Sequence, residues 1–224
     1  MIREFTAHEL WFLVLAVRWT VLLSAIAFLA GGSGGLVVAI LRVSRSGPVA
    51  VVATAYIKIV QGTPLLMQLY LVYFGASLLG VTSDAWTAAA LGLTLYASAF
   101  LGEIWRGCIQ AIPREQWEAA RALALGYPSQ LRFVILPQAL RIALPPTVGF
   151  LVQLLKGTSL ASIIGFTELT RAAAIVNNAT FRPLIVYATV AGLYFVLCWP
   201  LSLLSEHLER RLERAGARTV HFQF

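Results

Sequence analysis

The sequence predicts an all-α polytopic membrane protein that crosses the bilayer about five times as a single domain, residues 1–224. Hydrophobic residues make up 59% of the 224 residues and charged residues only 12%, and the mean hydropathy is +0.79. These values differ strongly from those of a typical soluble domain. The length allows several spans of ~20 residues with their loops, but no additional soluble domain of ordinary size.

The first apolar block covers 10–41, which exceeds one crossing and contains Arg18. We therefore expect an interfacial lead followed by a span over 19–41. Because no polar segment interrupts the block, an uncleaved first span is favoured over a signal peptide. Gly31 and Gly35 lie within the span and no Lys-Ser/Thr pair follows them, which favours close helix packing over a phosphate-binding loop.

The second apolar block predicts a span over 49–79 that is kinked near Thr63 and Pro64. Proline removes a hydrogen-bond donor and frees a carbonyl. A membrane tolerates a freed carbonyl only where neighbouring helices or a water-filled cavity satisfy it. The kink is therefore either a plain structural bend or part of a polar pathway.

The third span, expected over 85–106, contains Glu103 near its end. A glutamate within a span is costly unless it is paired or hydrated, so it is a functional candidate by default. Arg106 lies three residues later on the same helix face, and a simple ion pair at the membrane edge explains the glutamate equally well.

A long polar passage over 107–137 separates the apolar blocks and predicts a short helix outside the membrane. Pro113 suits the first turn, and Glu118 places a negative charge near the positive end of the helix dipole. Because alanine disfavours positive φ and glycine accepts it, we expect the turn after this helix at Gly126 rather than at Ala124. The alanine-rich helix is thin enough to enter another protein's groove, although it could equally be an ordinary solvated turn.

Two further spans are expected over 139–164 and 184–204, joined by a polar connection and followed by a charged helical tail. The first of them contains Pro145 and Pro146, where we expect another kink. Lys156 near its end either serves a transport pathway or extends its ammonium group to the outer membrane interface.

The distribution of arginines predicts the orientation, because positive residues concentrate on the cytoplasmic side of membrane proteins. Five spans place nine arginines on one side and three on the other. We therefore expect the N-terminus outside and the C-terminus in the cytoplasm. The inner set is Arg42, Arg45, Arg114, Arg121, Arg132, Arg210, Arg211, Arg214 and Arg218, and the outer set is Arg3, Arg171 and Arg182.

Several motifs occur in an order that points to one family. They are Gln61–Leu69, Glu103–Gly107 followed by Ile112-Pro113, and Glu118–Pro137, which contains Glu-Ala-Ala, a later glycine and a final Leu-Pro. In these motifs the chain resembles the permease subunits of ATP-binding-cassette importers of the polar amino-acid uptake family, of the histidine, glutamine and glutamate permease type. The family usually has glycine at position 124 and arginine at position 61, and often aspartate at position 157, where this chain has Ala124, Gln61 and Gly157.

The resemblance implies a type I ABC importer permease fold in which the loop over 107–137 carries the coupling helix. Its coupling residues would be Glu118, Ala119, Ala120, Arg121, Ala124 and Gly126. We take the substrate pathway or gate to include Thr63, Pro64, Gln68, Glu103, Lys156, Thr158 and Ser159.

The implied function is transport of a polar amino acid or similar small solute across the cytoplasmic (inner) membrane, with no covalent chemistry in this chain. The implied partners are two ATPase subunits, a second permease subunit that is identical or paralogous, an extracytoplasmic solute-binding protein and membrane lipid. ATP and Mg would bind to the ATPase, because the chain has no nucleotide-binding motif. Cys108 and Cys198 are its only cysteines, and no metal or other cofactor is expected. The net charge of +7 is explained by membrane orientation rather than by nucleic acid.

A secondary transporter or channel is the main alternative. It would require inverted repeats, broken helices in matched halves or a relay of intramembrane acids and histidines. The sequence shows no repeat, and Glu103 is its only acid within the expected spans. A membrane-embedded enzyme would need a cluster of catalytic polar residues, which is not apparent, while a purely structural membrane subunit remains open.

Overall fold

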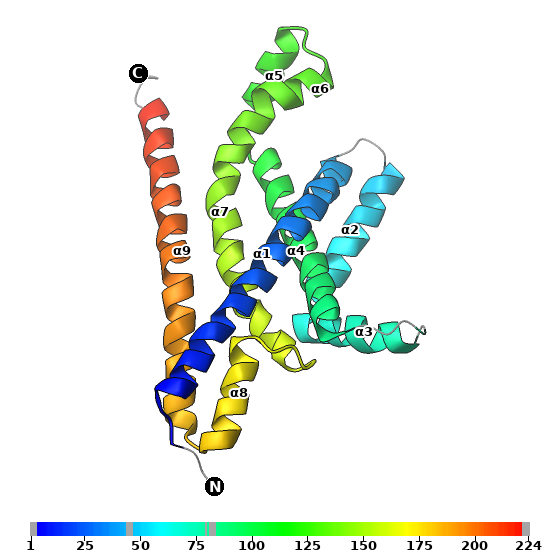
Figure 1. Ribbon diagram of the computed structural model, residues 1–224. Coiled ribbons are helices and arrows are strands. Elements are labelled where there is room, and N and C mark those ends of the chain that lie inside the picture. Colours follow the sequence, from blue (N-terminus) through cyan, green and yellow to red (C-terminus); the bar gives the residue numbers. More distant parts are fainter. Residues whose placement is uncertain (1–3, 44–46, 79, 81–83, 221–224) are drawn as a thin grey trace.

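The computed structural model describes residues 4–43, 47–78, 80 and 84–220, with side chains to residue 214. Helices account for nearly all of this part of the chain, and it contains no strand (Figure 1). In chain order they are α1 (Ala7–Val43), α2 (Gly47–Gly62), α3 (Leu65–Leu78), α4 (Ala85–Gln110), α5 (Arg114–Ala122), α6 (Tyr127–Ser129), the π-helical segment η1 (Gln130–Ile135), α7 (Leu136–Gly157), the 3-10 segment η2 (Thr158–Ser162), α8 (Leu169–Thr180) and α9 (Pro183–Val220).

Four helical segments in the described part of the chain are long and apolar enough to cross a membrane, and the bent pair α2 and α3 can supply a fifth crossing. The four are Ala7–Val43, Ala85–Gln110, Tyr127–Ser162 and Pro183–Arg214. The helix at the N-terminus differs from our expectation in one respect. It runs through 37 residues without a break, so the interfacial lead and the span from residue 19 form one helix.

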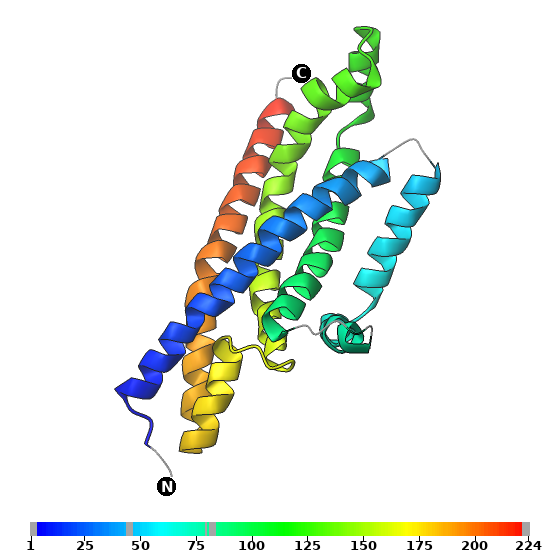
Figure 2. The same ribbon diagram turned by 45° about the vertical axis from the view of Figure 1, so that its right-hand side comes forward.

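The long helices run along the long dimension of the molecule, and α1 crosses α4 and α7 obliquely (Figures 1 and 2). Small residues allow α1 and α4 to approach closely. A Cβ atom added at Gly31 would lie 2.5 Å from the Cβ of Ala97, and one added at Gly35 would lie 3.0 Å from the backbone nitrogen of Gly102. Close helix packing through Gly31 and Gly35 is thereby confirmed.

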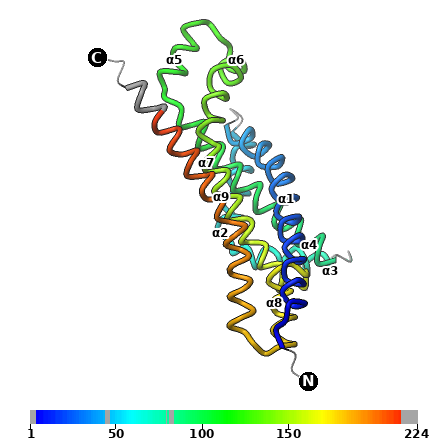
Figure 3. Tube along the Cα trace, turned by 60° about the vertical axis from the view of Figure 1, so that its left-hand side comes forward, coloured from blue at the N-terminus to red at the C-terminus, as the bar shows by residue number. Residues whose placement is uncertain are grey.

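The two ends of the molecule carry different elements. One end holds α5, α6 and the C-terminal part of α9, and the other holds the N-terminus, α3 and α8 (Figures 1 and 3). The described arginines expected on the inner side lie toward the first end, whereas Arg171 and Arg182 lie at the second. Arg3 and Arg45 lie outside the described residues, as does the side chain of Arg218.

Candidate functional site

The break between α2 and α3 is the largest departure from regular helix within the apolar blocks. The two helix axes differ by 105°, so the kink expected near Pro64 is a sharp corner. The side chain of Gln68 reaches back across it, and its Nε2 atom donates to the carbonyl oxygens of Val60 at 2.6 Å and Thr63 at 3.0 Å. The Thr63 hydroxyl donates to the Ile59 carbonyl at 2.9 Å. Gln68 thus satisfies the Val60 carbonyl, which is the one that the proline leaves without a helical donor.

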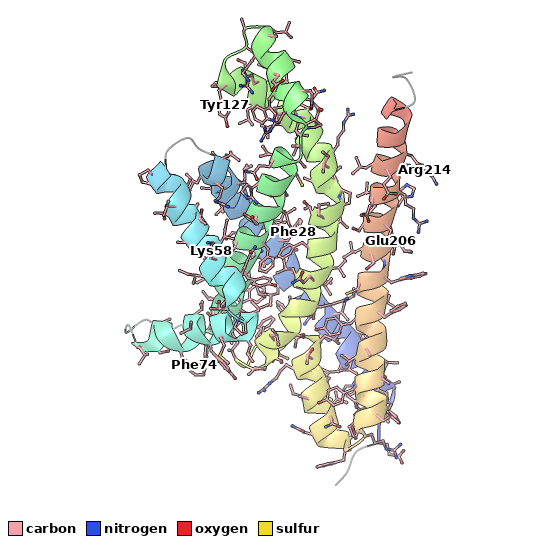
Figure 4. All side chains as sticks on the ribbon, turned by 180° about the vertical axis from the view of Figure 1, so that it is seen from behind. Phe28, Lys58, Phe74, Tyr127, Glu206 and Arg214 are labelled. Carbon is pink, nitrogen blue, oxygen red and sulfur yellow. The ribbon has the colours of Figure 1, made fainter. Side chains whose placement is uncertain are left out.

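The surface at this corner is unusual for a membrane protein. Residues 61–64 are all exposed on the single chain. Lys58, one turn earlier on α2, is exposed as well (Figure 4). Irregular backbone inside a bilayer is tolerated where it is buried in protein or lines water, but not where it faces lipid. The exposed corner therefore requires water or another protein beside it.

The segment after α7 lies next to the corner. A Cβ atom added at Gly157 would lie 3.1 Å from the Cδ2 atom of Leu65, the first residue of α3. Thr158 is fully buried, and its hydroxyl donates to the Leu155 carbonyl at 2.7 Å. The Ser159 hydroxyl, which is half-buried, donates to the Lys156 carbonyl at 2.7 Å. Gly157 therefore packs beside the start of α3, next to the corner, and the expected pathway residue Thr158 is closed off from solvent in this state.

Lys156 is exposed and lies near Cys198 of α9. Within the described part of the chain, no hydrogen bond or ion pair joins its side chain to Thr63 or Gln68. The same helix carries Gln153, whose Nε2 atom donates to the Tyr96 hydroxyl of α4 at 2.9 Å. Lys156 thus lies on the α9 side of α7, whereas the adjacent Gly157 packs on α3.

Glu103 has an ion-pair environment. Its two carboxylate oxygens accept from Arg106, at 2.8 Å from Nε and 2.5 Å from Nη2. Arg42 of α1 lies 3.7 Å from the same carboxylate and donates to the Thr54 hydroxyl of α2 at 2.6 Å. The expected ion pair with Arg106 is present, and the cluster connects α1, α2 and α4.

The short helix expected in the polar passage is α5, and it projects from the end of the bundle (Figure 3). Ala120 is buried against the neighbouring segments, whereas the remaining expected coupling residues are exposed. The Trp117 and Tyr127 rings stack with centroids 6.1 Å apart, which braces α5 against α6. The exposed members are Glu118, Ala119, Arg121, Ala124 and Gly126.

The expected position of the turn after α5 was wrong. Ala124 has φ +55°, whereas Gly126 has φ −65° and ψ 156°. The backbone N–H groups of Leu125 and Ala124 donate to the carbonyls of Ala120 at 3.3 Å and Arg121 at 2.9 Å. This is a Schellman motif, which forms only if the residue at position 124 turns left-handed. Two hydrogen bonds worth about 1 kcal/mol each offset the roughly 1–2 kcal/mol that alanine loses there.

One site was missed entirely from the sequence, namely the buried carboxylate of Glu168. It accepts the backbone N–H of Arg171 at 2.8 Å, which caps α8, and the Tyr194 hydroxyl of α9 at 2.9 Å. Next to it, the backbone N–H of Leu169 donates to the Thr20 hydroxyl of α1 at 3.1 Å. Burial raises the pKa of the Glu168 carboxyl, against the opposing effect of the hydrogen bonds that it accepts. Glutamate is not among the preferred N-cap residues, so the sequence around Glu168 did not predict that it caps a helix.

The described residues contain no group of three or more His, Cys, Asp or Glu side chains that could hold a metal ion. The arrangement is one of helix packing, a polar corner and a projecting helix. It can move a solute or transmit a movement.

Comparison with known proteins identifies close relatives. A family model described as "Binding-protein-dependent transport system inner membrane component" matches residues 11–214. The chain is 34% identical over 200 residues to the probable amino-acid ABC transporter permease protein YckA of Bacillus subtilis (strain 168), covering 89% of this chain and 88% of that protein. It is 34% identical over 203 residues to the L-cystine transport system permease protein TcyB of the same organism, covering 90% and 87%.

A solved structure agrees with these sequence matches. The crystal structure of an amino acid ABC transporter with histidines contains a chain that is 35% identical, with a TM-score of 0.87. The match covers 94% of this chain and all of that chain. The fold is therefore the type I fold of ABC importer permeases.

Proposed function

Because the chain belongs to the family of binding-protein-dependent transport system inner membrane components, it is a permease subunit of an ABC importer, and we propose that its solute is a polar amino acid or a similar small solute. The names of the relatives support this substrate class, because they are amino-acid and cystine permeases. The direction is import across the cytoplasmic membrane, from an extracytoplasmic solute-binding protein.

Helix α5 carries the proposal that energy enters from separate ATPase subunits. It is a nine-residue helix at the end of the bundle, with Glu118, Ala119 and Arg121 exposed and Ala120 anchored. A thin helix with an acidic start and a basic end suits a groove in a partner protein. Two ATPases, each with its own ATP and Mg, would dock on two such helices.

The corner between α2 and α3 supports the proposal of a second permease subunit. Its exposed backbone over 61–64 requires water or protein in the membrane. A pathway formed between two permease copies, identical or paralogous, provides both. Thr63, Pro64, Ser159 and Lys156 would then line the pathway or its gate, and Thr158 would become accessible when the gate moves.

Transport is a shift between two populations of conformers. ATP closes the ATPase dimer, the docked α5 helices move with it, and the packing of η2 on α3 changes so that the pathway opens to the other side. Glu103 and the two arginines beside it would keep α1, α2 and α4 moving as one unit.

Docking is tested by the substitution Glu118→Lys, which puts a positive charge near the N-terminal end of α5. In proteoliposomes that contain the ATPase and a solute-loaded binding protein, uptake and stimulated ATP hydrolysis should both fall. Glu209→Lys makes the same charge change at an exposed position of α9 and should leave both near wild type. Normal copurification of the ATPase with the Glu118→Lys chain, together with normal uptake, would refute α5 as the coupling helix.

The pathway role of Lys156 is tested separately. Lys156→Ala should abolish uptake while the ATPase still copurifies, and Lys156→Arg should retain part of the uptake. Uptake by the alanine variant at the wild-type rate, with equal protein in the membrane, would instead mean that Lys156 only extends to the membrane interface.

The proposed orientation places α5 in the cytoplasm and the N-terminus outside, as the arginine distribution indicates. A single engineered cysteine beside Arg171 should react with an impermeant reagent in intact cells, and one beside Arg121 should not. The reverse labelling pattern would invert the topology.

A further inference from the structure

We propose that the α1, α4 and α7 helices hold one anionic phospholipid, with an acyl chain in an apolar cavity between them and its phosphate at Arg42 and Arg114. The inference goes beyond the transport function and does not depend on which solute is carried. It rests on two adjoining cavities with complementary linings.

The first cavity has a volume of about 570 Å³ and is lined almost entirely by apolar side chains. Its walls come from α1, α4 and the region around η1 and α7, and they include Gly32, Leu36, Ile40, Trp105 and Leu140. The volume lies in the range that one small ligand occupies. Leu36, Ile40 and Leu140 are more than half exposed, so the cavity is open at its side to the surrounding membrane.

The second cavity is polar and has a volume of about 520 Å³. It is lined by Arg42, Arg114, Gln110 and Tyr127 among others, and it shares Val43 and Ile109 with the apolar cavity. The shared residues place the two cavities end to end. An apolar slot that leads into a basic pocket at the membrane edge has the chemistry of a phospholipid with a negative headgroup.

The charge balance of the polar cavity favours an anion. Glu103 is the acid nearest to Arg42, at 3.7 Å, and it already has two shorter bonds to Arg106. The Nε atom of Arg42 is buried without a hydrogen-bond partner within the described part of the chain. Arg114 is exposed at the start of α5, with no ion pair among the described residues. Arg114 therefore retains capacity to bind a phosphate, and Arg42 adds positive charge to the same cavity.

Trp105 can serve as a fluorescent probe of lipid in the apolar cavity, because its side chain lines that cavity. The full chain is prepared with this tryptophan retained and the other five changed to Phe, and is placed in bilayers of phosphatidylethanolamine. Phosphatidylglycerol with brominated acyl chains should quench Trp105 at a mole fraction several-fold lower than brominated phosphatidylethanolamine does. If the variant does not fold, the lipids that copurify with the unaltered chain are measured by mass spectrometry, and phosphatidylglycerol should be enriched.

Two substitutions and their controls locate the site. Arg114→Gln should reduce the preference for phosphatidylglycerol about five-fold, since one basic residue near a membrane surface contributes about that factor. Arg141→Gln should not, because Arg141 is exposed beside Leu140 but lines neither cavity.

Gly32→Leu should fill the slot and abolish the quenching. A Cβ atom at Gly32 meets side-chain atoms no closer than 3.7 Å, so the first atom of the new side chain makes only ordinary van der Waals contact. Gly192→Leu, at an open position on α9, should leave the quenching unchanged. Equal quenching by both lipids, or an equal loss in the Arg141→Gln and Arg114→Gln variants, would overturn the proposal.

Discussion

Two segments of this protein have the same spacing of charges, Glu-x-x-Arg, and opposite structures. In Glu103-x-x-Arg106 both residues lie within α4, and the carboxylate binds the guanidinium with two bonds. In Glu168-x-x-Arg171 the glutamate precedes the first residue of α8, and its carboxylate binds the backbone N–H of the arginine instead. The first pair is partly exposed, whereas in the second Glu168 is buried and Arg171 is exposed.

Of these two segments, only the one with both residues inside a helix forms an ion pair. Within a helix, positions i and i+3 bring two side chains together on one face. At the residue that precedes a helix, the side chain instead turns toward unpaired backbone N–H groups. Glu168 then meets Tyr194 and has no cation among its described partners, so the two carboxylates should respond differently to substitution, salt and pH.

The largest effect is expected from Glu168→Ala. The change removes the cap of α8 and leaves the buried Tyr194 hydroxyl without its carboxylate acceptor, which together should lower the free energy of unfolding by about 3 kcal/mol. Reversible unfolding of the purified chain in SDS provides the measurement. A loss below about 1 kcal/mol would mean that the buried network contributes little.

A smaller loss, about 1 kcal/mol, is expected from Glu103→Gln. The pair is partly exposed, with side-chain exposures of 18% for Arg106 and 29% for Glu103, so solvent screens it. Added salt should weaken the pair further in the wild type but should leave the variant unaffected. A double-mutant cycle with Arg106→Gln isolates the pairwise energy, and a value near zero would contradict an energetic role for the pair.

The pH dependence of the free energy of unfolding should also distinguish Glu168 from Glu103, with a smaller effect. Its pKa is raised by burial, so the folded chain holds the proton at pH values where the unfolded chain has released it. The contribution of protonated Glu168 to the free energy of unfolding is fully present below the ordinary glutamate pKa. It is lost as the pH rises through the raised pKa of the folded state. Glu168→Gln should remove this slope from the SDS unfolding curves, and an unchanged slope would assign it to another group.

The smallest effect is expected from Arg171→Ala, because Glu168 uses only the backbone N–H of that residue. Stability should change by less than about 0.5 kcal/mol. Arg106→Ala, the matched change in the other pair, should cost about 1 kcal/mol. Equal losses in the two variants, measured side by side, would show that the two pairs do not differ as the structure indicates.

The sequence predicts much of the fold because membrane helices are determined by long apolar blocks and by proline. Pro64 marked the corner, and the acidic start and alanine-rich body marked α5. Local turn chemistry was harder to predict. Ala124 takes the left-handed conformation because the two backbone hydrogen bonds that end α5 require it there. The conformational preferences of alanine and glycine alone do not reveal this requirement. The glycine that the resembling family has at this position was the better guide.

The candidate site was predicted less completely than the fold. Sequence reasoning gathered Thr63, Pro64 and Ser159 as pathway residues, but it could not show that Gly157 packs on Leu65. Nor could it find Glu168, since Thr20, Tyr194 and the start of α8 come together only through tertiary packing. Contacts between residues that are far apart in the chain leave no periodic pattern in one sequence.

Helix α9 has a mechanical consequence. Its 38 residues, at ~1.5 Å each, form a rod of about 57 Å, nearly twice the ~30 Å of the hydrocarbon layer. Val186 and Val190 pack it onto α8 and α1 at one end, Cys198 packs it onto α7 further along, and the Ser205 hydroxyl donates to the Pro145 carbonyl of α7 at 2.9 Å. A tilt of about 5° about the packed end would swing the tip by about 5 Å, the rise of one helical turn. Spin labels at 185 and 209 should therefore keep a constant separation during turnover while the label at 209 moves relative to α5, and a change in their separation would show that the rod bends at Pro200.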